Sequence, residues 1–145
     1  MPVTYVIEPS ASIVRTRCVG RVRFDEVMRH FADLAADPDC PDTLDVLLDL
    51  SELTSLPETW QLRSVSSEMG LVSHRVRFGA CAIVATSDAV FGIARMYEVL
   101  AEDHFRATRV FREMRPAEEW LASHRQVAGG RPGLQSPEPP GRRCP

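Results

Sequence analysis

The sequence predicts a single α/β domain with a mostly parallel sheet of about five strands and about four helices, in the order β-β-α-β-α-β-α-β-α. Two short stretches, 44–50 and 79–85, are almost continuously apolar, as expected of strands covered on both faces. Segments with the helical spacing of apolar residues, such as 24–36, alternate with them. Strands and helices that alternate and are joined by short loops favour a parallel sheet with right-handed crossovers.

The composition is that of one folded domain followed by a tail. The chain has 145 residues, of which 44% are hydrophobic and 26% are charged, and its net charge is −3. These values are close to the globular average, and no segment concentrates Lys or Arg as a nucleic-acid-binding surface would. We expect the folded domain to span residues 1–127. Residues 128–145 are rich in Gly and Pro, which predicts a disordered tail.

The sequence carries no signal for a membrane or an oxidising compartment. No apolar run approaches the roughly 18 residues that span a bilayer, and the first residues lack the layout of a signal peptide. We therefore expect a cytoplasmic protein with free thiols, since its cysteines form no CxxC pair. The cysteines are Cys18, Cys40, Cys81 and Cys144.

The first part of the chain predicts two strands and a helix. Segments 4–8 and 12–19 have strand character, and the alternation in the second is typical of a half-exposed, antiparallel edge strand. In the helix predicted over 24–36, Phe31 and Leu34 share one apolar face.

A second helix is predicted to open after the apolar strand 44–50. Ser55 and Glu58 have the spacing of a capping box, with Pro57 in the first turn, and Gly70 is a typical C-terminal stop. The remaining elements are predicted as a strand over 79–85, a helix over 89–104, a strand over 108–114 and a helix from Pro116.

Short motifs spread over residues 4–125 carry a resemblance to a known family. They are Gly20-Arg-Val, Leu34-Ala-Ala-Asp-Pro38, Leu47-Leu-Asp49-Leu-Ser51, Ala82-Ile-Val-Ala85, Phe91-Gly-Ile-Ala-Arg-Met-Tyr97, Val110-Phe111 and Ala117-Glu-Glu-Trp-Leu121. In this order and spacing they resemble the STAS-like proteins, whose best-known members are bacterial anti-anti-sigma factors. The chain looks most similar to an uncharacterised bacterial branch that is grouped with STAS and with the CRAL-TRIO lipid-binding domains.

The resemblance places a regulatory turn at the start of the second helix. In STAS regulators a Ser there is phosphorylated, and spacing from Asp49-Leu50-Ser51 puts that turn at 57–60. Glu58 fills the Ser position and Thr59 is the nearest hydroxyl, so the usual phosphorylatable Ser is missing. Glu58 could stand in permanently for a phosphoserine, but its spacing from Ser55 favours simple helix capping.

The sequence nominates no catalytic chemistry. Asp49, at the carboxyl end of a predicted strand, could orient a ligand, although we favour a role in binding loop amides. The histidines have no metal-binding spacing, and no nucleophile elbow, phosphate loop or zinc-protease motif occurs. We therefore predict no enzyme activity, no metal and no cofactor.

The helix predicted over 89–104 has more apolar residues than one core face needs. Val90, Ala94 and Tyr97 form an adequate core stripe, and other apolar side chains lie off it. Such a surplus indicates a partner, a ligand groove or packing on a neighbouring helix. The candidate interface or groove residues are Trp60, Phe91, Gly92, Arg95, Met96 and Val99.

Two functions follow from these observations. We predict a non-enzymatic regulatory or protein-interaction module of the STAS-like type, with a protein partner or a second copy, as a homodimer, on the helix over 89–104. The alternative is a binding protein for a small apolar or lipid-like ligand in a groove between the second and third helices. No nucleic-acid partner and no integral membrane segment is expected.

Overall fold

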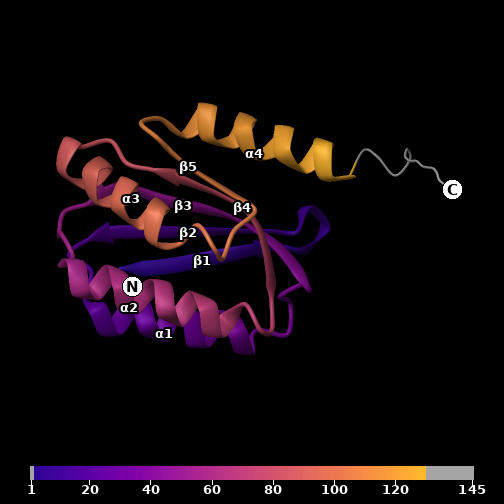
Figure 1. Ribbon diagram of the computed structural model, residues 1–145, viewed down its shortest axis with the longest axis horizontal. Coiled ribbons are helices and arrows are strands. Elements are labelled where there is room, and N and C mark those ends of the chain that lie inside the picture. The colour runs from indigo at the N-terminus through magenta and orange to yellow at the C-terminus, as the bar shows by residue number, and fades with distance from the viewer. Residues whose placement is uncertain (1, 130–145) are drawn as a thin grey trace, which may run out of the picture.

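The computed structural model describes residues 2–129, which form one five-stranded sheet and four α-helices (Figure 1). The elements are β1 (Val3–Glu8), a short 3-10 helix (Pro9–Ala11), β2 (Ile13–Gly20), α1 (Phe24–Ala36), β3 (Thr43–Leu53), α2 (Thr59–Val72), β4 (Arg77–Val84), α3 (Asp88–Leu100), β5 (Ala107–Phe111) and α4 (Met114–Gly129). The predicted fold class and element order are confirmed.

The strands lie side by side in the order in which they occur in the chain, β1-β2-β3-β4-β5. β1 is antiparallel to β2, and the other neighbours are parallel. The prediction that segment 12–19 is an edge strand is therefore wrong, because β2 lies between β1 and β3. Thr16 of β2 pairs with Tyr5 and with Leu48, and Leu48 pairs with Ile83, so these side chains share one face of the sheet.

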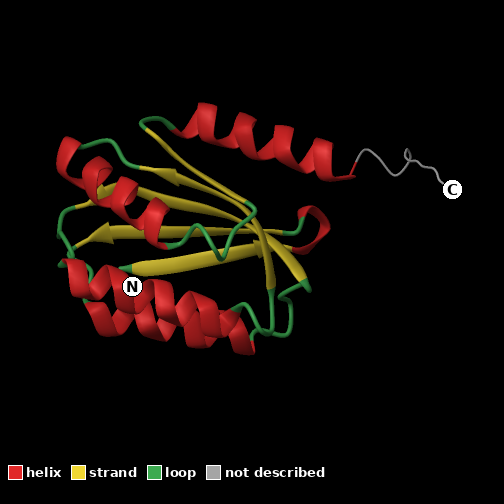
Figure 2. Cartoon of the chain, viewed as in Figure 1, coloured by secondary structure: helices red, strands yellow, loops and turns green. Residues whose placement is uncertain are grey.

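The helices cover both faces of the sheet unequally, with α1, α2 and α3 on one face and α4 on the other (Figures 1 and 2). Alternate side chains of β3 point to opposite faces of the sheet: Val46 lies in the core under α1, α2 and α3, and Leu47 lies in the core under α4. This double coverage explains why the strand is almost continuously apolar. The larger core lies under α1, α2 and α3 and includes Phe31, Leu34 and Tyr97.

Several element boundaries differ from the sequence prediction, and packing explains one of them. β3 continues past Leu50 to Leu53. α2 runs through Gly70 to Val72, so Gly70 does not stop the helix. A Cβ at Gly70 would lie 3.0 Å from Cε1 of His104, so the small residue allows the close approach of that ring.

The predicted tail lies almost entirely outside the described residues. α4 ends at Gly129, and residues 130–145, including Cys144, are not described. Within residues 2–129, Cys18 and Cys81 are buried free thiols and Cys40 is a half-buried one. No helix in the described part of the chain is both long and apolar enough to cross a membrane.

Candidate functional site: a cavity under three helices

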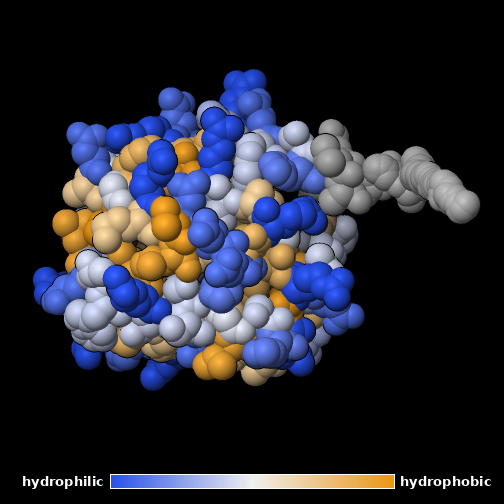
Figure 3. Space-filling view, viewed as in Figure 1, coloured by the Kyte–Doolittle hydropathy of each residue, from blue (hydrophilic) through white to orange (hydrophobic). Residues whose placement is uncertain are grey.

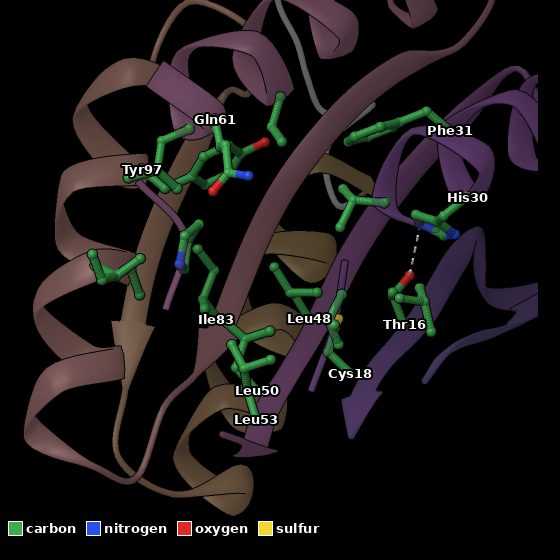
Figure 4. A pocket seen from close by; sticks show the side chains of 18 of the residues that line it. Thr16, Cys18, His30, Phe31, Leu48, Leu50, Leu53, Gln61, Ile83 and Tyr97 are labelled. Atoms are coloured by element: carbon green, nitrogen blue, oxygen red, sulfur yellow. Dashed lines mark hydrogen bonds between the residues drawn. The ribbon is translucent and has the colours of Figure 1, made fainter. Parts of the chain in front are cut away.

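A cavity of about 490 Å³ lies between the sheet and helices α1, α2 and α3 (Figure 4). Side chains of β2, β3 and β4 form its floor, among them Cys18, Leu48, Leu50 and Ile83. The three helices form its walls. A volume of this size lies in the range of small-molecule sites and far exceeds the small voids of an ordinary core.

The central strand shows that this volume is not filled by the protein. β3 has two strands on each side and helices over both faces, which should bury its inward-facing residues completely. Leu44, near the start of β3, is fully buried, but Leu48, Leu50 and Leu53 remain half-buried. All three of these half-buried residues line the cavity, and because helices cover both faces of β3 we attribute their remaining exposure to the cavity.

The cavity opens at the carboxyl ends of β2 and β3. Its exposed lining residues all come from the two loops that follow these strands: Arg21 and Arg23 from the first loop, and Leu56 and Glu58 from the second. The carboxyl ends of parallel strands are where ligands bind in open α/β sheets. The mouth of the cavity therefore lies where this class of fold places its sites.

The polar groups inside the cavity are electrically neutral near pH 7. His30 of α1 lies 3.4 Å, Nε2 to Oγ1, from Thr16 of β2 (Figure 4), and its Nδ1 is buried without a hydrogen-bond partner among the described residues. Burial lowers the pKa of His30 to about 4, opposed by the nearby carboxylate of Asp33. Burial, and secondarily the charge of Asp49, raises the pKa of Cys18 to about 11. A mostly apolar, uncharged ligand body would match this interior.

Tyr97 of α3 also lines the cavity, and its pKa is raised above the ordinary range by burial. Its phenol is therefore protonated at neutral pH. Figure 4 shows Tyr97 on the α3 wall, with Gln61 of α2 on the same side of the cavity. These side chains supply polar atoms on the wall opposite His30, which is the usual layout of an apolar site with a small number of orienting groups.

The two mouth loops are tied to each other by Ser55. Its hydroxyl accepts a hydrogen bond from the N–H of Val22 at 3.0 Å and lies 3.3 Å from the carbonyl of the same residue. The prediction that Ser55 forms a capping box with Glu58 is therefore wrong. The capping box at α2 joins Glu58 to Gln61, whose Oε1 accepts from the Glu58 N–H at 2.8 Å. Pro57 precedes this cap and is not in the first turn.

The predicted regulatory turn thus forms part of the cavity mouth. Ser55 and Glu58 line the cavity, and Thr59 is the exposed first residue of α2. Asp49, expected at the carboxyl end of its strand, lies within β3, which continues to Leu53. Its Oδ1 accepts from the N–H of Ser51 at 3.0 Å and from the Ser51 hydroxyl at 2.6 Å, and Arg17 lies 3.8 Å from its other oxygen.

The predicted interface or groove residues do not line this cavity. Trp60 is 54% exposed and packs on Phe24 of α1, with 5.3 Å between ring centroids. Phe91 is half-buried, packs against the core and lies under the guanidinium of Arg112, 4.1 Å from its ring centroid. It therefore contacts its own domain.

The outward side of α3 carries the other four predicted residues. Met96 and Val99 are 42% and 65% exposed. Gly92 has no atom near the position of a Cβ, and Arg95 pairs with Glu98 at 3.0 Å. Figure 3 shows apolar side chains gathered over α3 and beside α2 on this face of the molecule. The structure thus separates two features: a cavity facing Ile93, Ala94 and Tyr97, and an apolar outer surface on the same helix.

Sequence reasoning missed His30, Thr16 and Arg21. One signal could have found His30, because it is the polar residue at the helical spacing 27, 30, 34, within an apolar face. Thr16 alternates with Arg15 and Arg17 and so shares a strand face with Val14 and Cys18, but the residue pattern gives it no role. No local signal marks Arg21, whose position at the mouth depends on how β2 and β3 pair. Among the described residues, no group of three or more His, Cys, Asp or Glu side chains could hold a metal ion.

Comparison with known proteins supports the fold. No protein-family model matches this sequence, and no curated protein matches it significantly. Among solved structures, the chain is similar to an uncharacterized protein of the DUF3478 family from Shewanella loihica PV-4, described as having a SpoIIAA-like fold. The TM-score is 0.55 and the identity 20%, and the match covers 82% of this chain and 93% of that chain. The chain therefore has a SpoIIAA-like fold, which confirms the STAS-like architecture expected from the sequence.

Proposed function

We propose that this protein is a non-enzymatic module that binds a small, largely apolar ligand in the cavity under α1, α2 and α3. The observation that carries the proposal is the partial exposure of Leu48, Leu50 and Leu53 to an interior volume of about 490 Å³. A ligand that covers this apolar surface is bound more tightly, because each Å² of apolar surface removed from water stabilises the complex by about 25 cal/mol. Ligand occupancy could then act as the signal of a regulatory module.

A substitution that fills the cavity tests this proposal. Val65 of α2 lines the cavity, so Val65→Trp should occupy part of its volume. Val99→Trp is the matched control, because Val99 is 65% exposed on α3 and lies outside the lining. The fluorescence of the neutral apolar probe N-phenylnaphthylamine should rise with the wild type and with Val99→Trp, and should stay near its value in buffer with Val65→Trp.

Thermal unfolding of the two variants shows whether each one is folded. A folded Val65→Trp variant that binds the probe as tightly as the wild type would refute the proposed location. Absence of probe binding to the wild type would refute the proposal as a whole.

A second candidate function is contact with a protein partner or a second copy through the outer side of α3. The observation that favours it is the exposure of Met96 and Val99 beside Gly92, where another backbone could approach closely. This surface lies on the side of α3 opposite the cavity residues Ala94 and Tyr97. A partner on α3 and a ligand in the cavity would therefore share one helix, and the two functions are compatible.

A further inference from the structure

We propose that the ligand is an apolar carboxylate, with its carbon body inside the cavity and its carboxylate at the mouth, bound by Arg21. This inference rests on the proposed ligand-binding function and adds the chemical class of the ligand. It assigns a role to a side chain that the fold alone does not explain. Arg21 is an exposed lining residue of the mouth, and no hydrogen bond, ion pair or ring contact involves it within residues 2–129.

The other charged side chains of the mouth are already engaged. Nε of Arg23 lies 3.2 Å from Oδ1 of Asp25. Glu26 accepts from the backbone N–H of Arg23 at 2.7 Å, and Glu58 accepts from the indole of Trp60 at 3.1 Å. Glu26 and Glu58 also take part in the caps of α1 and α2. Among the described lining residues, Arg21 is thus the charged side chain at the mouth that remains available to a ligand.

The backbone at the mouth also favours an anion. α1 begins at Phe24 and α2 at Thr59, directly after the two mouth loops. The N-terminus of a helix carries a partial positive charge, so two such ends near one opening add to the effect of Arg21. The caps of both helices reduce this contribution, and the guanidinium is therefore the main recognition group.

The interior determines which way the ligand enters. His30, Cys18 and Tyr97 are uncharged at neutral pH because burial shifts their pKa values away from ionisation. No cationic side chain lies among the buried lining residues. An anionic group moved into this interior would lose its hydration without gaining a counter-charge. The carboxylate therefore stays at the mouth, where a planar guanidinium can bind both of its oxygens.

The test compares two probes that differ in the head group alone, dodecanoate and dodecanol, by displacement of N-phenylnaphthylamine. The wild type should bind dodecanoate about tenfold more tightly than dodecanol, as expected for hydrogen bonds to a charged group. Arg21→Gln should remove that advantage and leave dodecanol affinity unchanged. Arg29→Gln, an exposed α1 variant outside the lining with the same change in charge, should behave as the wild type.

Each other outcome has a defined meaning. Equal binding of the two probes by the wild type, or an Arg29→Gln effect as large as that of Arg21→Gln, would overturn the inference. N-phenylnaphthylamine binding that dodecanoate fails to displace would overturn it as well and leave the proposed function standing. If the wild type binds neither N-phenylnaphthylamine nor the two probes, the proposed function fails together with the inference.

Discussion

Replacing His30 with Gln should change how the stability of the protein depends on pH. The imidazole lies in the cavity wall, and its buried Nδ1 has no hydrogen-bond partner within residues 2–129, so protonating it in the folded state is unfavourable. Its pKa falls from 6.5 to about 4. The unfolded chain therefore binds a proton at a higher pH than the folded chain. The stability that the neutral ring provides is complete above pH 6.5 and is lost as the pH falls towards 4.

The size of this effect follows from the two pKa values of His30. The difference between 6.5 and about 4 corresponds to about 3 kcal/mol of unfolding free energy. Gln does not titrate and can still bond to the Thr16 hydroxyl. Urea unfolding of both proteins from neutral pH down to about pH 4 gives the difference between their unfolding free energies, in which shared carboxylate titrations cancel. The wild type should lose about 3 kcal/mol relative to His30→Gln over this range.

A difference that stays constant across this range would show that His30 does not cause this pH dependence. A histidine pKa near 6.5 for His30 in an NMR titration would do the same, because it would show that the ring is solvated in the folded protein. Either result would also weaken the description of the cavity wall as a dry, uncharged surface.

Two further predictions concern the contact between β3 and β4 near their first residues and the outer side of α3. Gly79→Ala should destabilise the protein by about 1–3 kcal/mol in urea unfolding, because the new Cβ would overlap Oδ1 of Asp45, the atom that accepts from the Ala80 N–H at 2.9 Å. Unchanged stability would show that Asp45 can move freely. Met96→Glu should leave the unfolding midpoint unchanged, since Met96 is 42% exposed, and should lower the mass measured by light scattering if the chain self-associates through α3. A dimer that survives this change would place the dimer contact elsewhere.

The fold could be predicted from sequence because its signals are local and agree with one another. The apolar run 44–50 indicated a strand covered on both faces, and β3 occupies the centre of the sheet. The helical spacing over 24–36 indicated α1 with the bounds that the structure shows. The misplaced edge strand has a physical reason. Arg15 and Arg17 alternate with buried residues because α4 covers only part of the outer face of β2, and not because β2 lies at an edge: Arg15 is half-buried and pairs with Glu118 of α4 at 3.0 Å, and Arg17 is exposed.

The site could not be predicted in the same way because it depends on contacts between distant segments. The sequence spacing predicts that Ser55 forms a capping box with Glu58. In the structure the Ser55 hydroxyl instead accepts a hydrogen bond from the N–H of Val22, 33 residues away. The cavity itself has no sequence signal, since Leu48, Leu50 and Ile83 have the residue types and spacing of an ordinary core. Whether three helices fill the space over a sheet depends on the summed side-chain volumes and on helix placement.

Methyl NMR can show whether an apolar molecule binds inside the cavity. Titration of the wild type with N-phenylnaphthylamine should shift the methyl signals of Leu48, Leu50 and Ile83, which line the cavity. The methyls of Leu71 and Val99, which are exposed and outside the lining, should not move. Shifts confined to Leu71 and Val99 would show that the cavity is not the binding site and would place the binding surface on the outside of α2 and α3.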